Sequence, residues 1–123
     1  MLRSRVAFTL LALMLSYRAA AQTPVQTISM WSFDFSPRPI HLAAGRPVIL
    51  TFVNRSGSGH DFTAKDFFAK SQITAGAAPS GKIELGAHQS KSITLIPHAG
   101  TYKAYCGHFL HRQFGMEDAI VVN

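Results

Sequence analysis

Short apolar segments, separated by turn residues at close intervals, constrain the fold of this chain most strongly. Apolar and polar residues alternate over a few positions at a time, as in Ile83–Leu85 and Ile93–Leu95, and glycine, proline or asparagine separates the segments. Alternation with a period of two is the pattern of a strand with one buried face, whereas a helix repeats its apolar residues every three to four positions. Seven or eight such segments predict an all-β protein, a Greek-key sandwich of two sheets.

The predicted strands begin with an alternating segment from Ile28 to Phe35. Its phase shifts by one residue between Met30 and Trp31, which we interpret as a β-bulge. The aromatic residues Trp31, Phe33 and Phe35 are expected to lie in the core. Further strands are expected at residues 40–42, 48–53, 60–62, 83–85, 93–95, 101–105 and 119–122.

One short helix is predicted within this β pattern. Thr63 and Asp66 have the spacing of a capping box, with aspartate in place of the usual glutamate, and two phenylalanines follow them. The helix is expected to extend to about Ser71. Residues 75–81 consist mostly of small side chains and are expected to form a loop.

The first 21 residues have the pattern of a secretory signal peptide. Arg3 and Arg5 form a basic start, residues 6–15 are almost all apolar, and three alanines precede Gln22. The apolar run is shorter than the roughly 20 residues that cross a bilayer, and a cleavage signal follows it directly. We therefore expect residues 22–123 to form one exported domain, free of the membrane after cleavage, in the bacterial periplasm.

Charge and size exclude some classes of function. Residues 22–123 contain nine lysines and arginines against six aspartates and glutamates, so the expected domain is mildly basic. The basic residues are scattered, with no run of three, which is typical of a solvated surface and not of nucleic-acid binding. A domain of this size buries enough surface to fold without disulfides or a structural metal, and we expect it to be a monomer.

Cys106 is the only cysteine, in a chain predicted to enter an oxidising compartment. An exposed free thiol would oxidise there, so this side chain is expected either to be buried and inert or to bind a metal. His111 and Met116 follow it in the loop before the last predicted strand. Thiolate, thioether and imidazole together suit copper that cycles between Cu(I) and Cu(II). The blue-copper arrangement needs a second histidine, and His60, at a strand start after a glycine-rich loop, is the best candidate.

These residues resemble those of the cupredoxins, the small blue-copper family that includes azurins, plastocyanins and rusticyanins. The resemblance covers residues 28–122 and depends on VILTFVNRSGSGHDF, on GTYKAYCGHFLHRQFGM and on the order His, Cys, His, Met. It implies one copper ion with three ligands in a plane and a fourth on the axis: His60 Nδ1, Cys106 Sγ and His111 Nδ1 in the plane, and Met116 Sδ on the axis.

The resemblance also implies one-electron transfer to a redox protein partner. The partner is expected to dock near His111, because the corresponding histidine is the ligand nearest the surface in similar proteins. Phe109, Leu110 and Phe114 flank His111 in sequence. They are expected either to pack inward and close the loop or to form an apolar rim for docking.

Three positions near the expected ligands need separate comment. Many cupredoxins have asparagine directly after the first histidine, where it ties the two ligand loops together, but this chain has Asp61, which cannot donate as an amide does. His108 lies inside the ligand loop and could compete for metal, although a closed trigonal geometry favours His111. Gly59 precedes the first histidine, as a glycine does in azurins, and is a weak candidate for a fifth contact.

Other functions stay open at this point. A periplasmic copper carrier or storage protein that delivers copper to another protein is the main alternative, and release of copper to a chelator would distinguish it from an electron carrier. An enzyme is not expected, because the sequence shows no Ser-His-Asp set, no paired carboxylates and no second copper site, and four protein ligands leave no open position. A metal-free or zinc-binding sandwich is the last alternative, although copper binds such sites more tightly than zinc.

Overall fold

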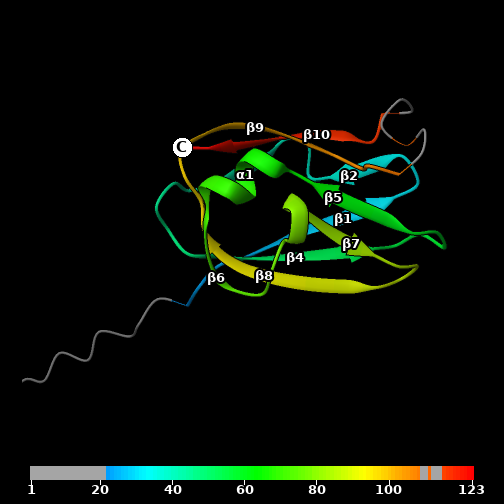
Figure 1. Ribbon diagram of the computed structural model, residues 1–123, viewed down its shortest axis with the longest axis horizontal. Helices are drawn as coiled ribbons and strands as arrows, with labels where there is room; N and C mark the ends of the chain where they lie inside the picture. The colour runs from blue at the N-terminus through cyan, green and yellow to red at the C-terminus, as the bar shows by residue number, and fades with distance from the viewer. Residues whose placement is uncertain (1–21, 109–110, 112–114) are drawn as a thin grey trace, which may run out of the picture.

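Two five-stranded sheets pack face to face in the computed structural model, which describes residues 22–108, 111 and 115–123 (Figure 1). In order across the first sheet, the strands are β2 (Asp34–Ser36), β1 (Val25–Trp31), β4 (Val48–Asn54), β8 (Ser90–Ile96) and β6 (Gln72–Ala75). The order in the second sheet is β3 (Ile40–Leu42), β10 (Glu117–Val122), β9 (Gly100–Tyr105), β5 (His60–Thr63) and β7 (Lys82–Leu85). The prediction of a two-sheet β-sandwich with one short helix is confirmed.

The core lies between the two sheets and is rich in aromatic rings. Strand β4 alternates between buried and partly exposed residues along its whole length, although its sequence is almost continuously apolar. The ring of Phe62 on β5 contacts Phe52 on β4, with ring centroids 4.9 Å apart, and Phe35 on β2, at 5.5 Å. Burial of each such ring contributes roughly 1.5–3 kcal/mol, so these three side chains hold the two sheets together.

The predicted bulge between Met30 and Trp31 is wrong, because the chain reverses direction there. Trp31 pairs with Asp34 across a two-residue turn, and β1 and β2 form an antiparallel hairpin. Phe33 lies in this turn with a left-handed φ of 63°. The turn removes Phe33 from the strand, so only Phe35 of the three aromatic residues expected in the core is buried, while Trp31 is 41 % and Phe33 42 % exposed.

The predicted helix is present as α1 (Lys65–Lys70), but the capping box is not formed. The N-cap is Ala64, and no side chain caps the helix. The hydroxyl of Thr63 donates instead to Asp61 Oδ1, at 2.6 Å. Strand β6, which follows α1, was not predicted, and all four of its residues are exposed. A 3-10 turn, η1 (Pro79–Gly81), precedes β7.

The predicted signal peptide lies outside the described residues and stays a prediction. Within the part of the chain that the structure describes, no helix has the length and apolar character needed to cross a bilayer.

Candidate metal centre

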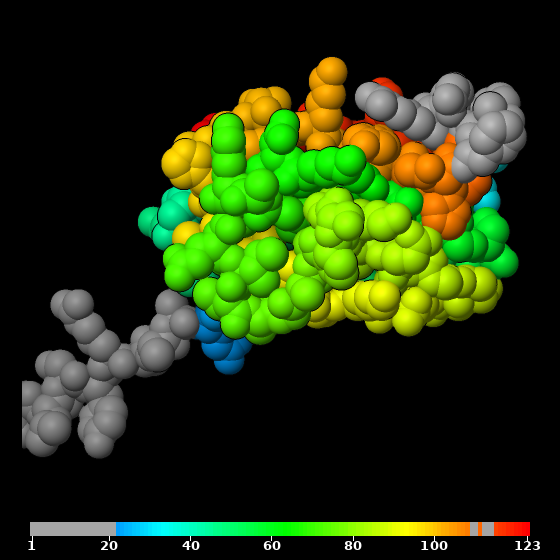
Figure 2. Space-filling view, viewed as in Figure 1, coloured from blue at the N-terminus to red at the C-terminus, as the bar shows by residue number. Residues whose placement is uncertain are grey.

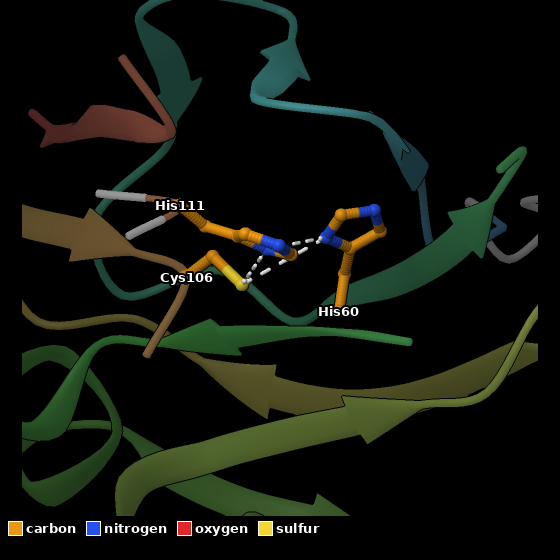
Figure 3. A group of neighbouring side chains, drawn as sticks. All are labelled: His60, Cys106 and His111. Carbon is orange, nitrogen blue, oxygen red and sulfur yellow. Dashed lines mark hydrogen bonds between the residues drawn. The ribbon is translucent and has the colours of Figure 1, made fainter. Parts of the chain in front are cut away.

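Three of the four predicted ligands converge at one end of the second sheet (Figure 3). His60 is the first residue of β5, Cys106 directly follows β9, and His111 lies in the connection from β9 to β10. Strands β5 and β9 are antiparallel neighbours that pair at Thr63 and Tyr105, so the start of β5 lies beside the segment that follows β9. The fold therefore brings together side chains that are up to 51 positions apart in sequence.

The spacing of the three side chains fits a metal ion. Cys106 Sγ lies 3.4 Å from His111 Nδ1 and 3.9 Å from His60 Nδ1, and the two Nδ1 atoms are 3.0 Å apart. Metal bonds to imidazole nitrogen and thiolate sulfur are about 2.0–2.3 Å long, which places ligands around one ion about 3–4 Å from each other. Two imidazoles and one thiolate at this spacing are a donor set for a transition metal.

His60 is fixed by the strand that carries it. All four residues of β5 are buried, and His60 is 1 % exposed. Its Nε2 lies 3.4 Å from the hydroxyl of Ser58, so Nδ1 is the nitrogen that faces Cys106 and His111. Burial, helped by the charges of His111 and His108, lowers the pKa of His60, although Asp61 opposes the shift. The ring is therefore neutral at physiological pH and has a lone pair free for a metal.

Cys106 is fully buried, as both sequence interpretations of it required. Burial raises the pKa of the thiol, and backbone N–H groups of Asp61 and His108 oppose this shift. The N–H of Asp61 donates to Sγ at 3.4 Å. Such a thiol stays protonated until a cation displaces the proton, so metal binding at this site is coupled to proton release.

Met116 is buried at the same end of the molecule, and its backbone closes the ligand loop. Its carbonyl oxygen accepts a hydrogen bond from the N–H of Cys106, at 3.1 Å, and its N–H donates to the carbonyl of His111, at 3.1 Å. These two hydrogen bonds tie three of the predicted ligands into one backbone ring. The axial role of the Met116 sulfur stays a prediction.

Asp61 links the segment that carries His60 to the segment that carries Cys106 by accepting hydrogen bonds. Its Oδ1 accepts from the N–H of Gly107, at 2.8 Å, and from the hydroxyl of Thr63, at 2.6 Å. A Cβ on Gly107 would lie 3.1 Å from Asp61 Oδ2, so a glycine lets the carboxylate approach this closely. The link expected from asparagine in similar proteins is thus present here with a carboxylate as acceptor.

His108 does not belong to the group formed by His60, Cys106 and His111. It belongs to a neighbouring group with Asp61 and Glu84. Its Nε2 lies 2.6 Å from Glu84 Oε1 and 3.7 Å from Asp61 Oδ2, and its ring stacks on that of His111 with centroids 5.5 Å apart. Glu84 therefore holds the nitrogen that would compete for a metal. A Cβ on Gly59 would lie 3.3 Å from His108 Cε1, so glycine also suits this crowded position.

Asn54 and Phe33 support the site, a role that was not predicted for either residue. The side-chain amide of Asn54 donates to the carbonyls of Ser58 and Gly86, at 2.8 and 2.9 Å, and so fixes the loop that precedes His60. An asparagine between a strand and a Ser/Gly-rich loop is a signal for such an arrangement. The ring of Phe33 meets that of His111 edge-on, with centroids 5.1 Å apart. Phe109, Leu110 and Phe114 lie outside the described residues.

Comparisons with known proteins agree with this fold. A family model described as a cupredoxin-like domain matches residues 4–122. The structure is similar to that of dithionite-reduced auracyanin from the photosynthetic bacterium Roseiflexus castenholzii, with a TM-score of 0.62 and 22 % identity, over 85 % of this chain and 99 % of that one. No curated protein sequence matches the chain.

Two further solved structures share the fold. Auracyanin B has a TM-score of 0.60 and 20 % identity, over 86 % of this chain and 93 % of that chain. A multicopper oxidase from Campylobacter jejuni has a TM-score of 0.61 and 10 % identity, and the match covers 86 % of this chain but 31 % of the oxidase. The sandwich is therefore an architecture found both as a separate protein and as part of a larger one.

Proposed function

The chain belongs to the cupredoxin-like family, whose model covers nearly its whole length, and on that premise we propose that it is an exported blue-copper protein that carries single electrons. Copper would be held by His60, Cys106, His111 and Met116. The observation that carries the proposal is the convergence of His60 Nδ1, His111 Nδ1 and Cys106 Sγ at distances of 3.0, 3.4 and 3.9 Å. When bound, copper would supply the one-electron change between Cu(I) and Cu(II).

The protein's own contribution is to hold these donors still and keep water away from the sulfur. His60 lies on a buried strand, Asn54 fixes the loop before it, and Asp61 connects it to Gly107. Ligands that do not move between oxidation states lower the reorganisation that accompanies electron transfer. The burial of Cys106 and its N–H donor from Asp61 set the surroundings of the sulfur, which tune the reduction potential.

Electrons would enter and leave at His111. It is partly exposed, whereas His60 and Cys106 are buried, and it contacts the exposed ring of Phe33. An imidazole edge beside an apolar side chain suits the small, transient interface of a redox encounter. Four protein ligands would leave no coordination position for a substrate, so the proposal is for electron transfer and not for catalysis.

The absorption spectrum of residues 22–123 with one equivalent of Cu(II) tests the proposal. We expect an intense blue band that Cys106→Ser abolishes, because the band arises from charge transfer between thiolate and copper. His98→Asn, which removes an exposed histidine of the turn before β9, is the control and should keep the band. A wild-type protein without the band would contradict the proposal. Loss of copper to a chelator in either oxidation state would favour a copper carrier instead.

A further inference from the structure

A groove with a volume of about 610 Å³ runs between α1 and β9, and none of its lining residues belongs to the metal centre. Helix α1 supplies Lys65, Asp66 and Lys70, and residues 99–103 and Tyr105 form the other wall. The two elements lie side by side on the face shown in Figure 2, α1 in green and β9 in orange. The groove is therefore a separate feature of the surface.

Positive charge is concentrated in this groove. Lys65, Lys70 and Lys103, three of the five lysines in the sequence, line it, and Asp66 is its one acidic residue. All three lysines are exposed, and within the described residues none of them forms a salt bridge. Lys70 Nζ lies 5.8 Å from the centre of the Tyr102 ring. The other lysines, Lys82 and Lys91, lie together near Glu84.

The arrangement of these charges selects one kind of occupant. Lys65 and Lys70 stand at opposite ends of α1, which separates their Cα atoms by roughly 8 Å along the helix axis. A small anion needs donors that converge on one point, and a bilayer needs a flat or convex surface. Several carboxylates along an extended segment match separated ammonium groups in a hollow, and the tyrosine side of the groove can contact the segment's apolar atoms.

We propose that the groove between α1 and β9 docks an acidic segment of a protein partner, with carboxylates paired to Lys65, Lys70 and Lys103. Oppositely charged surfaces steer association, so binding should weaken as ionic strength rises. This inference goes beyond the proposed electron transfer and does not depend on a bound metal, because no lining residue is a predicted copper ligand.

The experiment is a titration of ¹⁵N-labelled residues 22–123 with a decaglutamate peptide, followed by NMR, for both Cu(I)-loaded and copper-free protein. Shifts are expected in α1 and in β9. Lys65→Glu/Lys103→Glu should raise the Kd at least about tenfold, because repulsion replaces attraction at both walls. Lys82→Glu/Lys91→Glu changes the net charge equally outside the groove and is the matched control, with a much smaller expected effect. Thermal unfolding of both variants checks that they fold as the wild type does.

Several results would overturn the inference. They are shifts that map elsewhere, unchanged binding in Lys65→Glu/Lys103→Glu, or equal weakening in the control. Equal competition by inorganic phosphate would indicate a small-anion site. Binding to phosphatidylglycerol vesicles, but not to the peptide, would indicate a membrane surface. The proposed function is judged separately, since a protein that lacks the blue band can still bind the peptide, and Lys65→Glu/Lys103→Glu should keep the band.

Discussion

The two histidines of the metal centre lie in very different surroundings. His60 is part of a sheet, on a strand between β7 and β9 whose residues are all buried. His111 lies in a loop and is partly exposed, and its described ring neighbours are His60, His108 and Phe33. We call His60 and the loop that precedes it the inner side of the centre, because they belong to the sandwich. We call His111 and its loop, with Phe33 and Arg38, which contact them, the outer side, because this part of the centre lies outside the sheets.

The inner side is stabilised by partly buried hydrogen bonds of Asn54. Asn54 donates to the carbonyls of Ser58 and Gly86, and its Oδ1 accepts from the N–H and the hydroxyl of Ser56, at 3.0 and 2.9 Å. Asn54 itself is buried. Because the side chain of Asn54 has lost contact with water, its hydrogen bonds are costly to remove. The loop that ends at His60 is thus held by the same forces that hold the fold.

The outer side depends on contacts that are individually weak. Arg38 Nη1 donates to the carbonyl of Gly115 and pairs with Asp34, both at 3.2 Å, and both side chains of the ion pair are about half exposed. Exposed pairs of this kind contribute about 0–1 kcal/mol. The Phe33 ring contact with His111 adds roughly 0.5–1.5 kcal/mol. We therefore expect the side chains around His111 to separate at a lower cost in free energy than those around His60.

The largest effect is expected on the inner side, for Asn54→Ala. It removes five hydrogen bonds and leaves partly buried carbonyls without donors, so the free energy of unfolding should fall by about 2–4 kcal/mol. Urea denaturation measures this change. Ser92→Ala, which removes an exposed hydrogen bond to Thr51, is the control and should cost less than about 1 kcal/mol. Equal losses in the two variants would show that the inner side is not specially anchored.

On the outer side, Phe33→Ala is expected to change the free energy of unfolding less than Asn54→Ala does. It should nevertheless increase the rate of metal release measurably. Without the ring contact, His111 should leave the metal more readily, and copper release to a chelator should accelerate by up to about tenfold. The free energy of unfolding should change by less than about 1 kcal/mol, because Phe33 is already 42 % exposed. Stopped-flow absorbance measures the release rate.

Trp31→Ala is the control for this variant, because Trp31 is an equally exposed aromatic residue of the same hairpin. It should leave the release rate unchanged. If it accelerates release as much as Phe33→Ala does, the effect belongs to the hairpin as a whole and not to the ring that touches His111.

The smallest expected effect is a pH dependence of the free energy of unfolding that arises from Asp118, on β10. Its Oδ2 is buried and has no partner within the described residues, and burial raises the pKa of the carboxyl from 3.8 to about 6. The folded state therefore keeps a proton that the unfolded chain has lost. The free energy of unfolding falls as pH rises from 3.8 to about 6 and is constant above that range.

Asp118→Asn should remove this dependence. At pH 8 the variant should be more stable than the wild type by about 1 kcal/mol, less than the full pKa difference implies because solvent still reaches the residue. Below the unfolded pKa the advantage should disappear. Thermal unfolding between pH 3 and pH 8 measures the difference, and Asp66→Asn controls for the loss of one exposed charge. A constant advantage across the range would contradict the assignment of the pKa to Asp118.

The inner side and the general fold were accessible from the sequence, and much of the outer side was not. The strand at β4 was predicted from its apolar residues, and a strand start at His60 was predicted after the glycine-rich loop. Cys106, His111 and Met116 lie close enough in sequence for their spacing alone to indicate a ligand loop. These predictions needed only local periodicity and ligand chemistry.

The turn at Phe33 could not be predicted in the same way. A left-handed φ at a phenylalanine has no sequence signal, because glycine or asparagine is the usual residue in such a turn. The role of Asp61 as an acceptor depends on the direction of the Gly107 N–H, which only the folded chain fixes. The hydroxyl of Thr63, which was expected to cap the helix, donates to the carboxylate of Asp61 instead. Local rules fail here because partners distant in sequence compete for one group.

The burial of Cys106 also makes the molecule convenient to label. It is the only sulfhydryl in the chain and is fully shielded in the folded state, so maleimide reagents find no native target on the intact domain. A single cysteine introduced at an exposed position can then be conjugated selectively to a fluorophore or to a gold electrode, with the native residue left in place.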